Sequence, residues 1–170
     1  MVKEISNQEV VVIRNNGISV EDAAAFDKII LSPGPGIPTE AGIMMDLVKR
    51  LSPTHKILGV CLGHQCIGEV FGGKLENLSN VIHGKGILTT VKVESEPIYA
   101  GVPSTFMCGR YHSWVVSKTE FPDDLIVTAE DKDGYVMSLR HKDYNVVGVQ
   151  YHPESVLTPD GHQLIKNWLK

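Results

Sequence analysis

Residues Gly59-Val-Cys-Leu-Gly-His-Gln65 directly follow the apolar pair Ile57 and Leu58. An apolar run that meets a turn and then a helical pattern predicts a buried strand followed by a helix. A cysteine between two glycines at such a junction is typical of a nucleophile elbow, a sharp and strained turn that holds a reactive side chain exposed. The first N–H groups of the helix have no partners within it, so they favour a thiolate at Cys61 and can receive an oxyanion.

Strand and helix patterns alternate around this elbow. Continuous apolar runs at residues 10–13, 28–31 and 56–60 predict strands that are buried on both faces. Apolar residues recur at helical spacing within 39–51, and a second helix is expected from the elbow to about Phe71. Such alternation predicts a mostly parallel open sheet that is flanked by helices.

The second half of the chain has a different pattern. Short β-branched runs separated by turns predict strands that are partly antiparallel, at residues 88–93, 106–107, 115–116, 125–128, 136–140 and 146–149. Residues 161–169 have one apolar face and predict a closing helix. The expected fold class is therefore α/β, an open sheet with an additional antiparallel region of short strands, in a single domain that spans residues 1–170.

Composition narrows the classes of function. The 170 residues carry a net charge of −4 and no block rich in Lys or Arg, so neither a nucleic acid nor an anionic membrane is an expected partner. No apolar run reaches the roughly 20 residues that span a bilayer, and no signal peptide is visible, so a cytoplasmic location is expected. Three cysteines without framework spacing suit a reducing compartment. No metal site and no cofactor are expected, because metal-ligand motifs are absent from the sequence.

His152 and Glu154 stand two positions apart, so on an extended segment their side chains project to the same face. The carboxylate can then hold the imidazole in one tautomer and stabilise its charged form. Taken alone, this triplet could equally be a surface loop. Together with Cys61 and the glycine-containing loop Ser32-Pro-Gly-Pro-Gly36, it supplies a nucleophile, a base and oxyanion donors for acyl transfer.

Most other polar residues have simpler interpretations. Cys66 and Cys108 are expected to be structural, and His64 to pack or cap locally. The cluster Arg110-Tyr-His-Ser-Trp114 is a weak signal by itself, although His83 and His112 could line a site or a partner surface. Solvated side chains are expected at His55, His141 and His162, and exposed turns at Asp123, Asp124, Glu130, Asp131 and Asp133.

Five stretches together carry a resemblance to a known family: GVCLGHQ, SPGPG, HGK at 83–85, RYHSWVV and GVQYHPESVLTPDG. Across nearly all of the chain they resemble the class I glutamine amidotransferases, and most of all the glutaminase subunits of anthranilate synthase and aminodeoxychorismate synthase. The resemblance implies a glutaminase that hydrolyses L-glutamine through a cysteinyl thioester and passes ammonia to a chorismate-using synthase subunit.

The resemblance also implies roles for individual residues. Cys61, His152 and Glu154 match the catalytic triad, and the oxyanion donors fall on Leu62, Gly34 and Gly36. The glutamine contacts fall on Gly34, Pro35, Gly36, Gln65, Ser113 and Trp114. The family often has leucine at the last of these positions, which should matter little because that contact is usually made by the backbone.

One departure from the family concerns the start of the chain. The family's first strand has no counterpart here, and residues 1–7 resemble the end of the helix that follows it. Its absence is expected to leave neighbouring strands without hydrogen-bond partners. If the site cannot assemble without this strand, a non-catalytic binding subunit is the alternative. A stand-alone cysteine hydrolase of γ-glutamyl bonds, which would share the elbow, is a second alternative.

Overall fold

The structure, a computed structural model, describes the backbone of residues 1–170 and all side chains except those of residues 79–83. The interpretation of the His83 side chain as a lining residue therefore lies outside the described side chains. The strands are β1 (Lys28–Leu31), β2 (Lys56–Val60), β3 (Leu75–Val91), β4 (Thr105–Val116), β5 (Leu125–Asp131), β6 (Val136–His141) and β7 (Val146–Val149). The helices are α1 (Val2–Ile5), α2 (Val20–Ala23), α3 (Met44–Leu51), α4 (Leu62–Val70) and α5 (Gly161–Leu169), with 3-10 turns η1 (Pro38–Glu40) and η2 (Pro97–Tyr99).

All strands join one sheet in the order β1-β2-β7-β6-β5-β3-β4. Strands β1, β2 and β7 are parallel to one another. The remaining neighbouring pairs, β7 with β6, β6 with β5, β5 with β3 and β3 with β4, are antiparallel. The predicted open α/β class is confirmed, and the antiparallel region proves to be a continuation of the same sheet. Because Val60 pairs with Val149, the segments that follow β2 and β7 leave the sheet side by side at its carboxyl edge.

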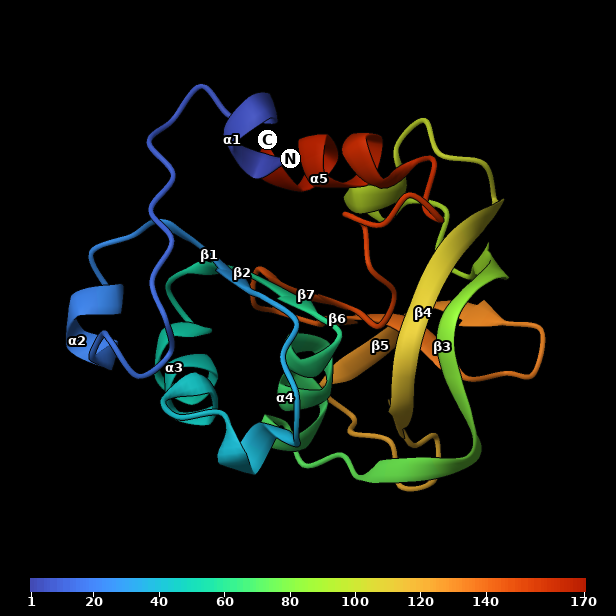
Figure 1. Ribbon diagram of the computed structural model, residues 1–170. Coiled ribbons are helices and arrows are strands. Elements are labelled where there is room, and N and C mark those ends of the chain that lie inside the picture. Colours follow the sequence, from blue (N-terminus) through green and yellow to red (C-terminus); the bar gives the residue numbers. More distant parts are fainter.

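Helices cover both faces of the parallel strands (Figure 1). On one face, α3 and α4 bury Val48 and Ile67 against Ile57 of β2. On the other face, α5 and η2 bury Leu164 and other apolar residues against Leu58. Successive residues of β2 thus pack into the cores on opposite faces of the sheet, which is why the sequence of β2 is continuously apolar. No helix in the described part of the chain is long and apolar enough to cross a membrane.

Several predicted elements differ from the structure. The strand predicted at residues 10–13 is wrong: this segment pairs with no strand, and Val12 is 81% exposed. A segment with a β-pattern forms a strand only where a neighbouring strand provides hydrogen bonds for its backbone. Here β1 is the edge strand of the sheet, and residues 10–13 do not pair with it. The runs at 106–107 and 115–116 belong to one strand, β4, because β3 pairs along its length. The helix predicted over 39–51 begins only at Met44, whereas α4 and α5 lie where predicted.

Candidate active site

Cys61 lies at the turn between β2 and α4 with φ 52° and ψ −97°. A non-glycine residue seldom adopts a positive φ, so the predicted strain at the elbow is present. The turn is tight because two glycines meet there: a Cβ on Gly59 would lie 2.4 Å from the carbonyl carbon of Gly63, and one on Gly63 would lie 2.6 Å from the carbonyl oxygen of Leu31. Glycine at both positions lets α4 begin directly against the ends of β1 and β2.

The expectation that the elbow exposes its side chain is wrong, because Cys61 is only 7% exposed. The reason is the segment that follows β7. Its first residue, Gln150, is fully buried and donates a hydrogen bond from Nε2 to Sγ of Cys61 at 3.6 Å. The sulfur is therefore held in a mostly enclosed position at the carboxyl edge of the sheet.

His152 comes two residues after Gln150 and is anchored by its backbone, because its N–H donates to the carbonyl of Gly109 at 3.1 Å. Its Nδ1 lies 2.7 Å from Oε1 of Glu154. Burial by itself lowers the pKa of His152, but hydrogen bonding and charge from Cys61 and Glu154 outweigh it and raise the pKa to about 9. The raised pKa favours the charged imidazole at neutral pH, and Glu154 binds the ring at Nδ1 while Nε2, on the other side of the ring, is buried.

Glu154 completes this line of groups. Its side chain is 50% exposed, so the carboxylate keeps contact with water while it binds the imidazole. Partial burial raises the pKa of Glu154, and the hydrogen bond and charge of His152 more than offset this, so the net pKa is lowered. Cys61, His152 and Glu154, the three residues predicted as a triad, thus lie at the same edge of the sheet, and both Cys61 and Glu154 raise the pKa of His152.

The loop with Gly34, Pro35 and Gly36 follows β1 and is exposed to solvent. A Cβ on Gly34 would lie 3.1 Å from Cδ2 of Leu62, so the loop rests against the first residue of α4. Gly36 has φ 81°, a conformation that suits glycine. The loop and the start of α4, the two predicted sources of oxyanion donors, therefore lie next to each other beside Cys61.

The other predicted glutamine contacts lie on α4 and β4. Gln65 is buried on the first turn of α4, and its Nε2 donates to the carbonyl oxygen of Trp114 at 2.9 Å. Ser113 and Trp114 are partly exposed on β4. This hydrogen bond joins the nucleophile's helix to the strand predicted to bind substrate through its backbone.

Sequence reasoning missed a buried network behind these residues. Arg110 is fully buried and forms an ion pair with Asp131, which is also buried, so the prediction of an exposed turn at Asp131 is wrong. Arg110 also donates from Nε to Nε2 of His112 at 3.1 Å. His141 is only 5% exposed, contrary to the solvated side chain predicted there, because it packs between Phe71 and Tyr144. An arginine in the middle of a predicted strand region was the available sign, since a buried arginine needs a carboxylate partner.

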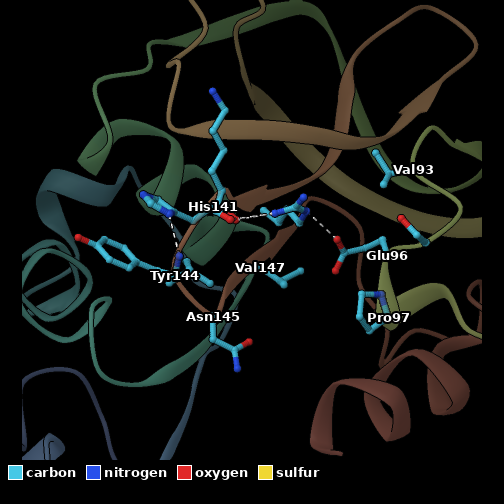
Figure 2. Close-up of a pocket in the computed structure, with 11 residues that line it drawn as sticks. Val93, Glu96, Pro97, His141, Tyr144, Asn145 and Val147 are labelled. Carbon is cyan, nitrogen blue, oxygen red and sulfur yellow. Dashed lines mark hydrogen bonds and ion pairs between the residues drawn. The ribbon is translucent and has the colours of Figure 1, made fainter.

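Two cavities differ in their relation to this site. One of about 480 Å³ is lined by Tyr111, His152, Glu154, Ser155 and Val156, so it opens directly beside the imidazole. The other, of about 250 Å³, includes Asn145 at the amino end of β7 (Figure 2). Cys61 lies at the opposite, carboxyl edge of the sheet. In this second cavity Glu96 on one wall pairs with Arg140 at 3.1 Å, across from His141 and Tyr144.

Fold and site together define a class I glutamine amidotransferase domain. The chain matches the family model "Glutamine amidotransferase class-I" over residues 3–170 and belongs to that family. It is 43% identical over 169 residues to anthranilate synthase component 2 of Pseudomonas aeruginosa, with 95% of this chain and 83% of that protein covered.

Two further relatives are longer proteins. The chain is 44% identical to the bifunctional protein TrpGD of Thermotoga maritima and covers 27% of it, with 95% of this chain aligned. It is 42% identical to the chloroplastic anthranilate synthase beta subunit 2 of rice, with 94% of this chain and 60% of that protein covered. A crystal structure from Thermoplasma acidophilum, described as part of a GMP synthase, is 25% identical with a TM-score of 0.78 over 91% of this chain and 76% of its own.

Proposed function

We propose that the chain is the glutaminase component of an anthranilate-type synthase, which hydrolyses L-glutamine and supplies the ammonia to a chorismate-using subunit. One observation carries the chemistry: the pairing of Val60 with Val149 brings the strained Cys61 at the start of α4 and the pair His152 and Glu154 to the same edge of the sheet. There the pKa of His152, about 9, favours its protonated form at neutral pH. A thiolate beside an imidazolium is the form in which cysteine attacks a carbonyl and histidine donates a proton.

The reaction follows from the positions of these groups. The Cys61 thiolate attacks the carboxamide carbon of glutamine, and the resulting oxyanion is stabilised by N–H groups of Leu62 and of the Gly34–Gly36 loop. His152 donates its proton to the departing nitrogen, which leaves as ammonia, and a thioester remains on Cys61. The neutral imidazole then takes a proton from water, the hydroxide cleaves the thioester to glutamate, and the thiolate and the imidazolium are restored. Glu154 orients the ring in both steps.

The synthase branch is proposed from the relatives. The anthranilate synthase subunits of Pseudomonas and rice are over 40% identical to this chain, whereas the structure described as part of a GMP synthase is 25% identical. This difference favours anthranilate formation, and with it tryptophan biosynthesis, over guanylate synthesis. The partner would then be the chorismate-binding subunit of anthranilate synthase, and no resident cofactor or metal is needed for the glutaminase step.

The test combines the purified chain with an anthranilate synthase component I, chorismate and glutamine, and follows anthranilate fluorescence and glutamate release. We expect both products with the natural chain and neither from glutamine with Cys61→Ser, while added ammonium salt restores anthranilate formation in the Cys61→Ser mixture. Glutamate release at full rate without any synthase would support the stand-alone hydrolase. If the chain releases no glutamate with any synthase, whether or not that synthase uses chorismate, the non-catalytic subunit would be supported.

A further inference from the structure

Gln150 donates a hydrogen bond to Sγ of Cys61 from a fully buried side chain. It belongs to neither the predicted triad nor the predicted glutamine contacts. We propose that Gln150 is a positioning residue that presents an N–H group to the nucleophile, and that buried hydrogen bonds leading from the carbonyl oxygen of Trp114 through Gln65 set the direction of its amide. This inference deepens the proposed function, because it rests on Cys61 being the nucleophile.

The carbonyl oxygen of Trp114 accepts hydrogen bonds from two buried side chains, His112 and Gln65, and His112 in turn accepts one from Arg110. Arg110 is paired with buried Asp131 and donates from Nε to Nε2 of His112 at 3.1 Å. A guanidinium has no acceptor atom, so Nε2 of His112 carries no proton and the neutral ring holds its proton on Nδ1. Burial and the charge of Arg110 keep the pKa of His112 low, at about 3, so the ring stays neutral.

His112 and Gln65 both donate to the carbonyl oxygen of Trp114. Nδ1 of His112 lies 2.8 Å from the carbonyl oxygen of Trp114, to which it donates. The same oxygen accepts from Nε2 of Gln65 at 2.9 Å. A carbonyl oxygen can accept two hydrogen bonds but can donate none, so it requires the amide nitrogen of Gln65 to face it.

The last step reaches the sulfur. Because its amide nitrogen faces the carbonyl oxygen of Trp114, Gln65 can use its second N–H to donate from Nε2 to Oε1 of Gln150 at 3.3 Å. Gln150 must therefore turn its oxygen toward Gln65 and its NH₂ group toward Cys61. A donor at this place stabilises a thiolate more than a thiol, since hydrogen bonds to charged groups are the stronger ones. Two titratable side chains outside these hydrogen bonds also act at this site: His152, which interacts with Cys61 and with His112, and Glu154, which interacts with His152.

The test measures how fast iodoacetamide alkylates Cys61 across a range of pH in the natural chain and in Gln150→Met, which has a similar shape but no N–H group. We expect the alkylation rate near neutral pH to fall about ten-fold and its pH profile to move to higher pH, while a urea titration shows that the variant is folded. Gln8→Met, at an exposed position, is the matched control and should keep the natural profile.

A second variant covers the case in which Gln150→Met does not fold. Gln150→Glu keeps an oxygen for Gln65 and replaces only the group that faces the sulfur, so its profile should also move to higher pH. An unchanged alkylation profile in a folded Gln150 variant would overturn the inference. The alkylation readout does not require glutaminase activity, so a failure of the proposed function would be seen separately, as a natural protein that releases no glutamate.

Discussion

Nδ1 of His152 and Oε1 of Glu154 lie 2.7 Å apart, so the carboxylate determines which ring nitrogen faces Cys61. Replacing Glu154 by glutamine keeps the shape but removes the charge that stabilises the imidazolium. We expect kcat for glutamine hydrolysis to fall about 10²-fold with little change in KM, because the group assists proton transfer and does not bind substrate.

Steady-state kinetics of Glu154→Gln in the assembled synthase measure this effect. Glu94→Gln, which alters an exposed carboxylate away from the site, is the control and should keep the natural kcat. A Glu154→Gln enzyme with unaltered kcat would show that the carboxylate has no part in orienting the ring.

The three cysteines should react very differently. Burial raises the pKa of Cys66 to about 12 and that of Cys108 to about 11, so neither forms a thiolate near neutral pH. A glutamine-like chloroketone should therefore label Cys61 alone, as peptide mass spectrometry would show. In denaturant, iodoacetamide should reach all three thiols; labelling of Cys66 or Cys108 in the folded chain would contradict the assignment.

Because of the charge of His152, the free energy of unfolding should depend on pH in the alkaline range. Its pKa in the folded chain, about 9, is higher than the ordinary value, so its contribution is fully present below that ordinary value. The contribution is then lost as the pH rises through about 9. Urea titrations give the free energy of unfolding at about pH 6 and at about pH 10. Between these two pH values the free energy should fall less in His152→Asn than in the natural chain. An equal loss in both chains would count against a raised pKa at this residue.

The ion pair between Arg110 and Asp131 has no exposed atoms, so its disruption should be costly. In Asp131→Asn the guanidinium stays buried without its counter-charge, and we expect a loss of about 3–5 kcal/mol in the free energy of unfolding. Asp123→Asn, which changes an exposed carboxylate, should shift that free energy by less than about 0.5 kcal/mol. Chemical denaturation compares the two, and a mild effect at Asp131 would show that water reaches the arginine.

The parts of the site that depend on near neighbours in sequence were predictable. The elbow at Cys61 follows from two glycines within two residues of it, and the pair His152 and Glu154 follows from period-two geometry. Gln150 could not be assigned in this way, since its role depends on the register of β7 against β2 and on the direction of a chain of hydrogen bonds. Asp131 was misjudged for the same reason, because only the pairing of distant strands brings it to Arg110.

The strand predicted at residues 10–13 failed for a related physical reason. The sequence is rich in β-branched residues, but a strand also needs a neighbour with free hydrogen-bonding groups, and this segment has none beside it. Val12 is left largely exposed as a result. Local pattern thus predicts a preference for extended backbone, while the sheet decides whether a strand forms.

The pairing of Val60 with Val149 has a consequence for how this domain can diversify. The proposed nucleophile and base follow the ends of two parallel strands, so their separation depends on that ladder and not on the turns that enter the strands from the opposite edge. Insertions before Lys56 or before Val146 should be tolerated without loss of turnover, and lineages could acquire new surface loops there while the chemistry stays unchanged.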